Sequence, residues 1–251
     1  MAVIMVFAMA PCMAFAQNPD SDVPETAVPP LGEDSKPLGK GSSYIAADAH
    51  VTSQTSDDDP DGTVFDPLKV RSTVQAKKNI TIKWEKQLDA ASYIIYSNRC
   101  GADNKMEQIG ETDKATYQVK GLKKGTYHKF LVVALGPDNK VVTTSKIIHV
   151  ATKGGKVGNY KNVTIKVKKG KKFKAAASAA VDTGAALNTK VVAKKASKKG
   201  RKHVGIRYES SDEAVATADA GGVITGVSPG TCQITAYAQN GVYKVLKLTV
   251  K

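Results

Sequence analysis

The sequence predicts an all-β protein with two β-sandwiches in tandem. Short runs of alternating apolar and polar residues fill residues 65–152 and 155–251, and turn residues separate these runs. Hydrophobic residues make up 41% of the 251 residues, which is enough for one or two packed cores. Ahead of the sandwiches we expect a signal peptide over residues 1–16 and a disordered acidic linker over residues 17–64.

The first sixteen residues have the pattern of a secretory signal peptide. The apolar run MAVIMVFAMAPCM is followed by Ala14, Phe15 and Ala16, a small-x-small cleavage site. The run is too short to span a membrane, so the mature chain is predicted to have no transmembrane span. The usual basic residues are missing, because the first Lys or Arg is Lys36. A lipoprotein site at Cys12 is an alternative that the neighbouring residues fit poorly.

Residues 17–64 contain 2 basic and 10 acidic residues, a net charge of −8, and six of the ten prolines. A segment of this composition cannot bury enough apolar surface to offset its chain entropy. Four residues match the start of a calcium loop, D-x-D-x-D-G: Asp57, Asp59, Asp61 and Gly62. Pro60 interrupts this loop and Leu68 replaces its bidentate acid, so a solvated acidic linker is the preferred interpretation.

In residues 65–152, strict alternation places Ile80, Ile82 and Trp84 on one face of a strand. Tyr93 and Ile95 share a face of the next strand. Seven short strands with a single tryptophan fit a β-sandwich.

The same region carries I-T-I-K-W-E (80–85), A-S-Y-I-I-Y-S (91–97) and L-K-K-G-T-Y-H-K-F-L-V-V-A (122–134). With these motifs it resembles a fibronectin type III domain. The tyrosine that caps the corner of that family is replaced here by His128. We expect its imidazole to make a similar hydrogen bond, with Phe130 facing inward beside it. The integrin-binding tripeptide R-G-D of some relatives is absent.

In residues 155–251, glycine and proline separate short β-rich runs, and Asn240-Gly241 is a strong hairpin signal. The segment 206–236 contains S-S-D-x-x-V-A-T followed by G-V-I-T-G-V-x-x-G-T-x-x-I-T-A. This pattern resembles the bacterial immunoglobulin-like domain, group 2. The resemblance implies an immunoglobulin-like sandwich in an extracytoplasmic bacterial protein. Residues 209–213 are interpreted as a polar bend, and residues 176–205 are expected to loop out in part.

The positive charge is concentrated at the C-terminal end. Residues 153–251 contain 20 basic and 5 acidic residues, a net charge of +15. The candidate binding residues form two clusters: Lys166, Lys168, Lys169, Lys171, Lys172 and Lys174, then Lys194, Lys195, Lys198, Lys199, Arg201 and Lys202. Such clusters attract polyanions. Nucleic acid is excluded as a partner by the predicted signal peptide and by the few aromatic residues available for stacking. A merely solvated lysine-rich surface is the alternative.

Residues for catalysis or metal binding are not grouped in the sequence. Its four histidines form no metal-ligand spacing, and G-x-S-x-G, H-E-x-x-H and phosphate-loop motifs are absent. Cys232 is in phase with apolar residues and is predicted to be buried, whereas Cys100 is predicted to lie exposed in a polar loop, so no disulfide is expected. We therefore predict no enzyme activity, no cofactor and no metal.

The sequence predicts a secreted, non-catalytic protein with adhesive or polysaccharide-binding modules, associated non-covalently with the cell surface. The expected partner is an anionic cell-envelope polymer or polysaccharide, and a host or neighbouring-cell surface is a further candidate. A structural spacer or a fragment of a larger surface protein is the alternative function. An accessory part of a carbohydrate-active enzyme is the third interpretation.

Overall fold

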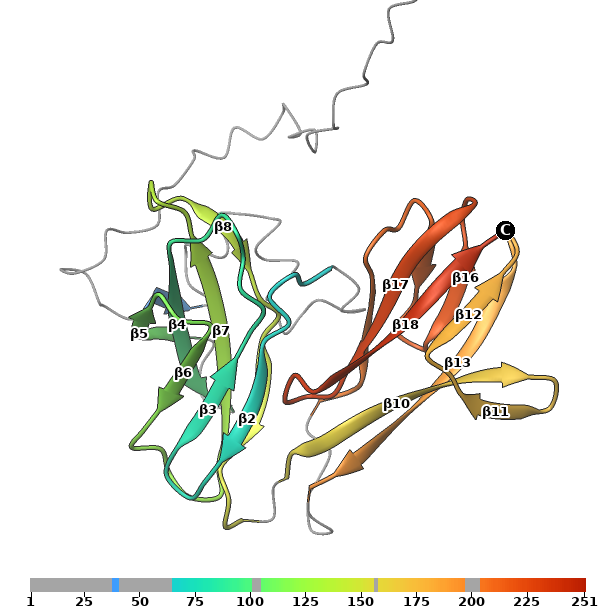
Figure 1. Ribbon diagram of the computed structural model, residues 1–251. Helices are drawn as coiled ribbons and strands as arrows, with labels where there is room; N and C mark the ends of the chain where they lie inside the picture. The colour runs from blue at the N-terminus through green and yellow to red at the C-terminus, as the bar shows by residue number, and fades with distance from the viewer. Residues whose placement is uncertain (1–37, 41–64, 101–104, 156–157, 197–203) are drawn as a thin grey trace, which may run out of the picture.

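The computed structural model describes residues 38–40, 65–100, 105–155, 158–196 and 204–251 (Figure 1). All regular elements in these ranges are β-strands, as the predicted fold class requires. The predicted signal peptide and the Asp57–Gly62 calcium motif lie outside the described residues. The bounds predicted for the two domains and the linker stay predictions.

The first sandwich pairs a three-stranded sheet with a larger one. The smaller sheet has the order β2–β3–β6, formed by Arg71–Gln75, Ile80–Lys83 and Thr116–Val119. The larger sheet has the order β1–β5–β4–β7–β8, formed by Leu38–Lys40, Lys105–Thr112, Ser92–Arg99, Tyr127–Leu135 and Val141–Thr144. Strand β9, Ile148–Ala151, also pairs with β7. Strand β1 belongs to the segment that was expected to be disordered.

The core of the first sandwich lies where the alternation predicted it. Ile80 and Ile82 are fully buried and Trp84 is 3% exposed, facing Tyr93 and Phe130 from the other sheet. The rings of Trp84 and Tyr93 meet edge to face with centroids 5.2 Å apart. Burial of a large apolar side chain such as Ile82 contributes about 1.5–3 kcal/mol to the free energy of unfolding.

His128 occupies the corner with Phe130, as predicted, but it reaches the backbone indirectly. Its Nε2 lies 2.9 Å from the Oγ1 of Thr126, and that hydroxyl donates a 2.7 Å hydrogen bond to the carbonyl of Lys123. An imidazole is shorter than a phenol, so the threonine bridges the remaining distance. Burial lowers the pKa of His128, and the nearby Arg99 adds to this shift.

The second sandwich has a five-stranded and a four-stranded sheet (Figure 1). The five-stranded sheet has the order β11–β10–β13–β16–β15, formed by Lys172–Ala175, Tyr160–Lys169, Ala186–Lys195, Val223–Gly226 and Ala216–Ala218. The other has the order β12–β18–β17–β14, formed by Ser178–Val181, Tyr243–Val250, Gly230–Tyr237 and Arg207–Ser210. Strands β12 and β18 are parallel, and the remaining pairs are antiparallel.

The segment 176–205 is more regular than expected, because it supplies β12 and the ten-residue strand β13. Residues 197–203 within it are not described. Val163, Ile165 and Val167 of β10 are buried against the opposite sheet. Cys232 is 6% exposed in the same core, which confirms its predicted burial.

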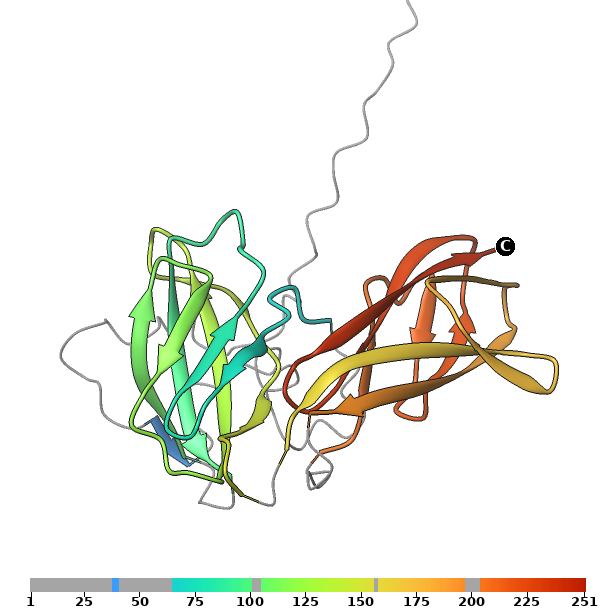
Figure 2. The same ribbon diagram turned by 60° about the horizontal axis from the view of Figure 1, so that its bottom comes forward.

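The turn between β17 and β18 contacts the first sandwich through hydrogen bonds. In both Figure 1 and Figure 2 its tip lies beside β2 of the first sandwich. The amide of Ser72 donates a 3.0 Å hydrogen bond to the carbonyl of Asn240, and the amide of His149 donates a 2.7 Å bond to the carbonyl of Gln239. The side-chain amide of Asn240 returns a 3.1 Å bond to the Ser72 hydroxyl. The predicted hairpin turn is therefore also an interdomain contact.

Tyr127 adds a second group of bonds between the sandwiches. Its hydroxyl accepts a 2.9 Å hydrogen bond from the Nε2 of Gln239 and donates a 2.9 Å bond to the carbonyl of Gly158. Asn159 exchanges two 2.8 Å bonds with the backbone of Ala151. These bonds attach both the connecting segment and the β17–β18 turn to the end of the first sandwich.

Candidate anion-binding surface

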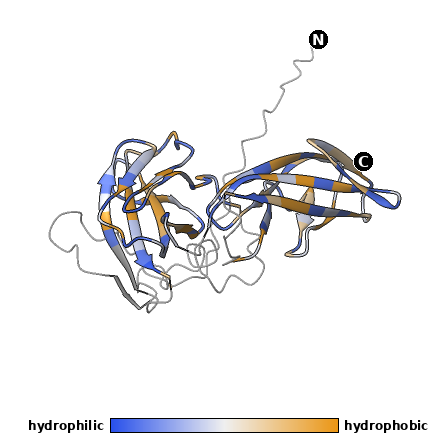
Figure 3. Ribbon diagram, turned by 90° about the horizontal axis from the view of Figure 1, so that it is seen from below, coloured by the Kyte–Doolittle hydropathy of each residue, from blue (hydrophilic) through white to orange (hydrophobic). Residues whose placement is uncertain are grey.

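The solvent-facing side of the five-stranded sheet carries the candidate site. Directly opposed residues of antiparallel strands share a face. Because Val163, Ile165 and Val167 point inward, the alternate residues of β10 point to solvent. The ladders with β13 extend this outer face across the sheet. Figure 3 shows the alternation of hydrophilic and hydrophobic residues along these strands.

Four lysines lie on this outer face, and we call them together the basic face: Lys166, Lys168, Lys190 and Lys194. None of the strand residues that share the outer face is acidic, from β11 across to β15. Lys166 is directly opposite Lys190, so their Cβ atoms are about 4.5–5.5 Å apart. Like charges in this arrangement destabilise a sheet, and a bound anion relieves the repulsion.

The residues predicted to bind anions do not all lie on one surface of the structure. Lys166, Lys168 and Lys194 lie on the basic face. Four others lie at the β10–β11 turn or on the opposite side of β11: Lys169, Lys171, Lys172 and Lys174. Lys195, at the end of β13, pairs with Tyr160 on the other side of the sheet. The remaining predicted residues lie outside the described ranges: Lys198, Lys199, Arg201 and Lys202.

The sequence interpretation missed Lys190. It lies between the two clusters and belongs to neither, because it comes from the segment expected to loop out. The alternation of Leu187, Thr189 and Val191 was the available signal, since it places Lys190 on the solvent side of a strand.

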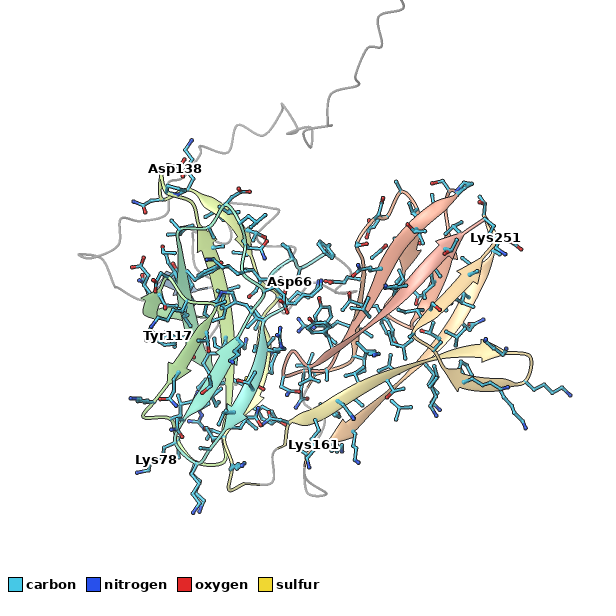
Figure 4. The ribbon with its side chains drawn as sticks, in the orientation of Figure 1. Asp66, Lys78, Tyr117, Asp138, Lys161 and Lys251 are labelled. Atoms are coloured by element: carbon cyan, nitrogen blue, oxygen red, sulfur yellow. The ribbon has the colours of Figure 1, made fainter. Side chains whose placement is uncertain are left out.

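A second charged cluster is buried between the sandwiches. Glu209, fully buried, accepts a 3.2 Å bond from the Lys69 ammonium and a 2.9 Å bond from the amide of Asp66. It also accepts a hydrogen bond from the hydroxyl of Tyr237, and the ammonium of Lys146 lies 3.6 Å away. Figure 4 shows Asp66 between the two sandwiches. Glu209 belongs to strand β14, so the interpretation of residue 209 as part of a polar bend is wrong.

Burial governs the protonation of this cluster. Desolvation raises the pKa of Asp66 and of Glu209, and the ammonium groups of Lys146 and Lys69 partly oppose the shift. Tyr237 is also buried, and burial beside Glu209 raises its pKa well above the usual value. The groups compensate one another within the interface, so they are not available to an external ligand.

Cys100 is half-buried, not exposed as the sequence interpretation assumed. Its Sγ lies 3.2 Å from the Nδ1 of His149. Within the described residues, no three His, Cys, Asp or Glu side chains are grouped to hold a metal ion. The described residues contain no helix long and apolar enough to cross a membrane.

Both halves of the described structure are thus β-sandwiches, each built from two sheets. Residues 169–250 match the model of the bacterial Ig-like domain, group 2, which confirms the resemblance seen in the sequence of this segment. Such modules are typical of extracellular or surface proteins and also occur in carbohydrate-active enzymes.

Fibronectin type III domains are among the similar solved structures. The FN5 domain of Drosophila Lar is 27% identical and has a TM-score of 0.31, with 36% of this chain and 97% of that domain covered. The fn3 domain of human contactin 1 is 20% identical and also has a TM-score of 0.31, with 37% and 80% covered. No curated protein matches the chain.

Proposed function

We propose that this chain is a non-catalytic secreted protein whose second sandwich binds an anionic polymer of the cell envelope. The observation that supports it is the basic face, on which four lysines share an outer surface whose described strand residues include no acidic one. A surface of one sign attracts a polyanion and concentrates it locally. Cell-surface association is then non-covalent, and a host or neighbouring-cell surface bearing a similar polymer is a further partner.

The interface between the sandwiches supports this use of the basic face. Glu209, Tyr237 and Tyr243 lie on the outer side of the four-stranded sheet, where they bond to Lys69 and Glu85 of the first sandwich. The first sandwich therefore contacts one end of the sheet that lies opposite to the basic face. A polymer can reach the lysines without displacing it.

Export and display are part of the proposal. Residues 1–16 would direct secretion, and the acidic residues 17–64 would link the exported end to two domains at 65–152 and 155–251. The matching module is common outside the cytoplasm, which agrees with this arrangement.

Retention on purified cell walls at low and high salt tests the proposal. The test variant changes the four lysines of the basic face to glutamine: Lys166, Lys168, Lys190 and Lys194. The control variant makes the same change at four exposed lysines of the first sandwich: Lys77, Lys78, Lys114 and Lys120. We expect the test variant to bind at least about tenfold more weakly at low salt and the control to bind as the wild type does. Equal losses in both variants, or retention independent of salt, would contradict the proposal.

A structural spacer is the second candidate, and the hydrogen-bonded interface favours it. A tandem joined through Tyr127, Gln239 and Asn240 holds its ends at a constant separation. If neither cell walls nor a glycan array retains the wild-type chain, the spacer function is the better one.

A further inference from the structure

We propose that the polymer bound by the basic face is a polysaccharide bearing carboxylate groups, with one sugar ring packed on Phe173. This inference rests on the proposed function, because it assigns the chemical class of the ligand at the same surface. It adds an aromatic residue to a site that was defined by charge alone.

Phe173 lies on the outer face at the edge of the sheet. It belongs to β11, the edge strand, and its partner across the ladder is Lys168. Its side chain is 39% exposed, which is unusual for a phenylalanine in a strand. The next outward residue of β11 is Ala175, opposite Lys166, so only a methyl group flanks the ring along the strand.

The lysines of β10 and β13 place positive charge on one side of this ring. Lys168 is beside Phe173, and Lys166 follows two residues along β10, about 6.6–6.8 Å away. Lys190 faces Lys166 from the next strand. A carboxylate placed between these two ammonium groups would remove the repulsion that their pairing imposes.

The chemistry of the outer face favours a charged sugar over other polyanions. The face of an aromatic ring carries partial negative charge and attracts the C–H groups of a sugar ring, whereas a polyphosphate offers only charge. Hydroxyl and amide side chains occupy five of the outward positions across the sheet, where they can bond to sugar hydroxyls: Asn162, Thr164, Asn188, Thr217 and Thr225.

A lipid surface fits less well. The other large exposed apolar residue on this face is Val192, which is opposite Thr164. The strand β10 and the charged Lys166 separate it from Phe173. An interfacial membrane site needs a continuous apolar surface, which these two residues do not form.

Titration of the full chain with two polyanions tests the inference. The probes are alginate, a polyuronate, and inorganic polyphosphate, in the same metal-free buffer of low ionic strength. We expect Phe173→Ala to weaken alginate binding about tenfold, as truncation of a stacking ring does, and to leave polyphosphate binding unchanged. Phe173→Tyr should retain alginate binding, and Val192→Ala is the control for an apolar loss on the same face. Melting curves show whether each variant is folded.

Each result separates this inference from the proposed function. Equal alginate affinity in wild type and in folded Phe173→Ala would overturn the inference. Binding of polyphosphate without alginate would also overturn it, while the proposed anionic-polymer function would stand. Binding of vesicles of anionic lipid that depends on Phe173, with no affinity for alginate, would replace the sugar by a lipid. Failure to bind either polymer or cell walls would remove both proposals.

Discussion

Replacing Gly241 by alanine should open the interface between the sandwiches. Gly241 has a φ of +79°, and a Cβ built on it would overlap the carbonyl oxygen of Val70 and lie 2.7 Å from the Cα of Arg71. Both contacts are backbone atoms, so neither can move aside as a flexible side chain would. The turn must therefore retreat, and the hydrogen bonds between Asn240 and Ser72 lengthen with it.

The expected loss of interface stability is the sum of a conformational cost and a hydrogen-bond cost. The left-handed conformation costs alanine about 1–2 kcal/mol, and each broken hydrogen bond costs about 1 kcal/mol. With two or three interface bonds broken, the total is about 3–5 kcal/mol. Hydrogen exchange measures this directly at the amides of Ser72 and His149, which donate across the interface. Their protection should fall about 100-fold to several thousand-fold.

Gly184→Ala is the matched control for this experiment. Gly184 has a φ of +75°, close to that of Gly241, but nothing lies within 4 Å of an added Cβ. It therefore carries the conformational cost without the clash, and its variant should leave the exchange of Ser72 and His149 unchanged. Equal exchange in the Gly241→Ala variant and this control would refute the steric argument.

Three further predictions concern the interface and the thiols. Tyr127→Phe removes a hydroxyl that makes several interdomain bonds, so it should lower the free energy of unfolding by about 1–2 kcal/mol in urea titration. Burial raises the pKa of Asp66 and Glu209, so the stability they contribute is complete below their usual values of 3.8 and 4.5 and is lost as the pH rises through the native values. As the pH falls from neutral toward 4.5, acidification should thus raise the melting temperature of the wild type relative to D66N/E209Q, and parallel curves would contradict this. Cys100, which is half-buried, should react with a thiol reagent before the core thiol of Cys232, whose pKa burial raises.

Local periodicity predicted the cores well. The alternation of Ile80, Ile82 and Trp84 identified the buried face of β3, and the phase of Cys232 with Ile234 placed it in the second core. Both features depend on residues two apart in one strand. A strand with one face against a core requires this alternation, so it can be recognised without knowledge of the partner strand.

Features that depend on the other sandwich were not predictable in this way. Glu209 is polar and precedes two serines, so its sequence favours an exposed bend, yet the first sandwich buries it completely. Asn240-Gly241 was recognised as a turn, but its docking against Ser72 requires the placement of a segment more than 160 residues away. Lys190 was missed for a related reason, because its neighbour Lys166 is known only from the register of β10 with β13.

The two outer sides of the second sandwich lead to a final prediction. The first sandwich contacts one end of one side, where it buries Glu209 against Lys69, and the other side carries the basic face. If the first sandwich makes no contact with the polymer, Gly241→Ala should loosen the interface between the sandwiches. Retention of the variant on cell walls, and the salt dependence of this retention, should then be unchanged. A loss of retention in this variant, with the basic face intact, would mean that residues of the first sandwich also contact the polymer. The same variant therefore distinguishes a ligand site confined to the five-stranded sheet from one that extends over both domains.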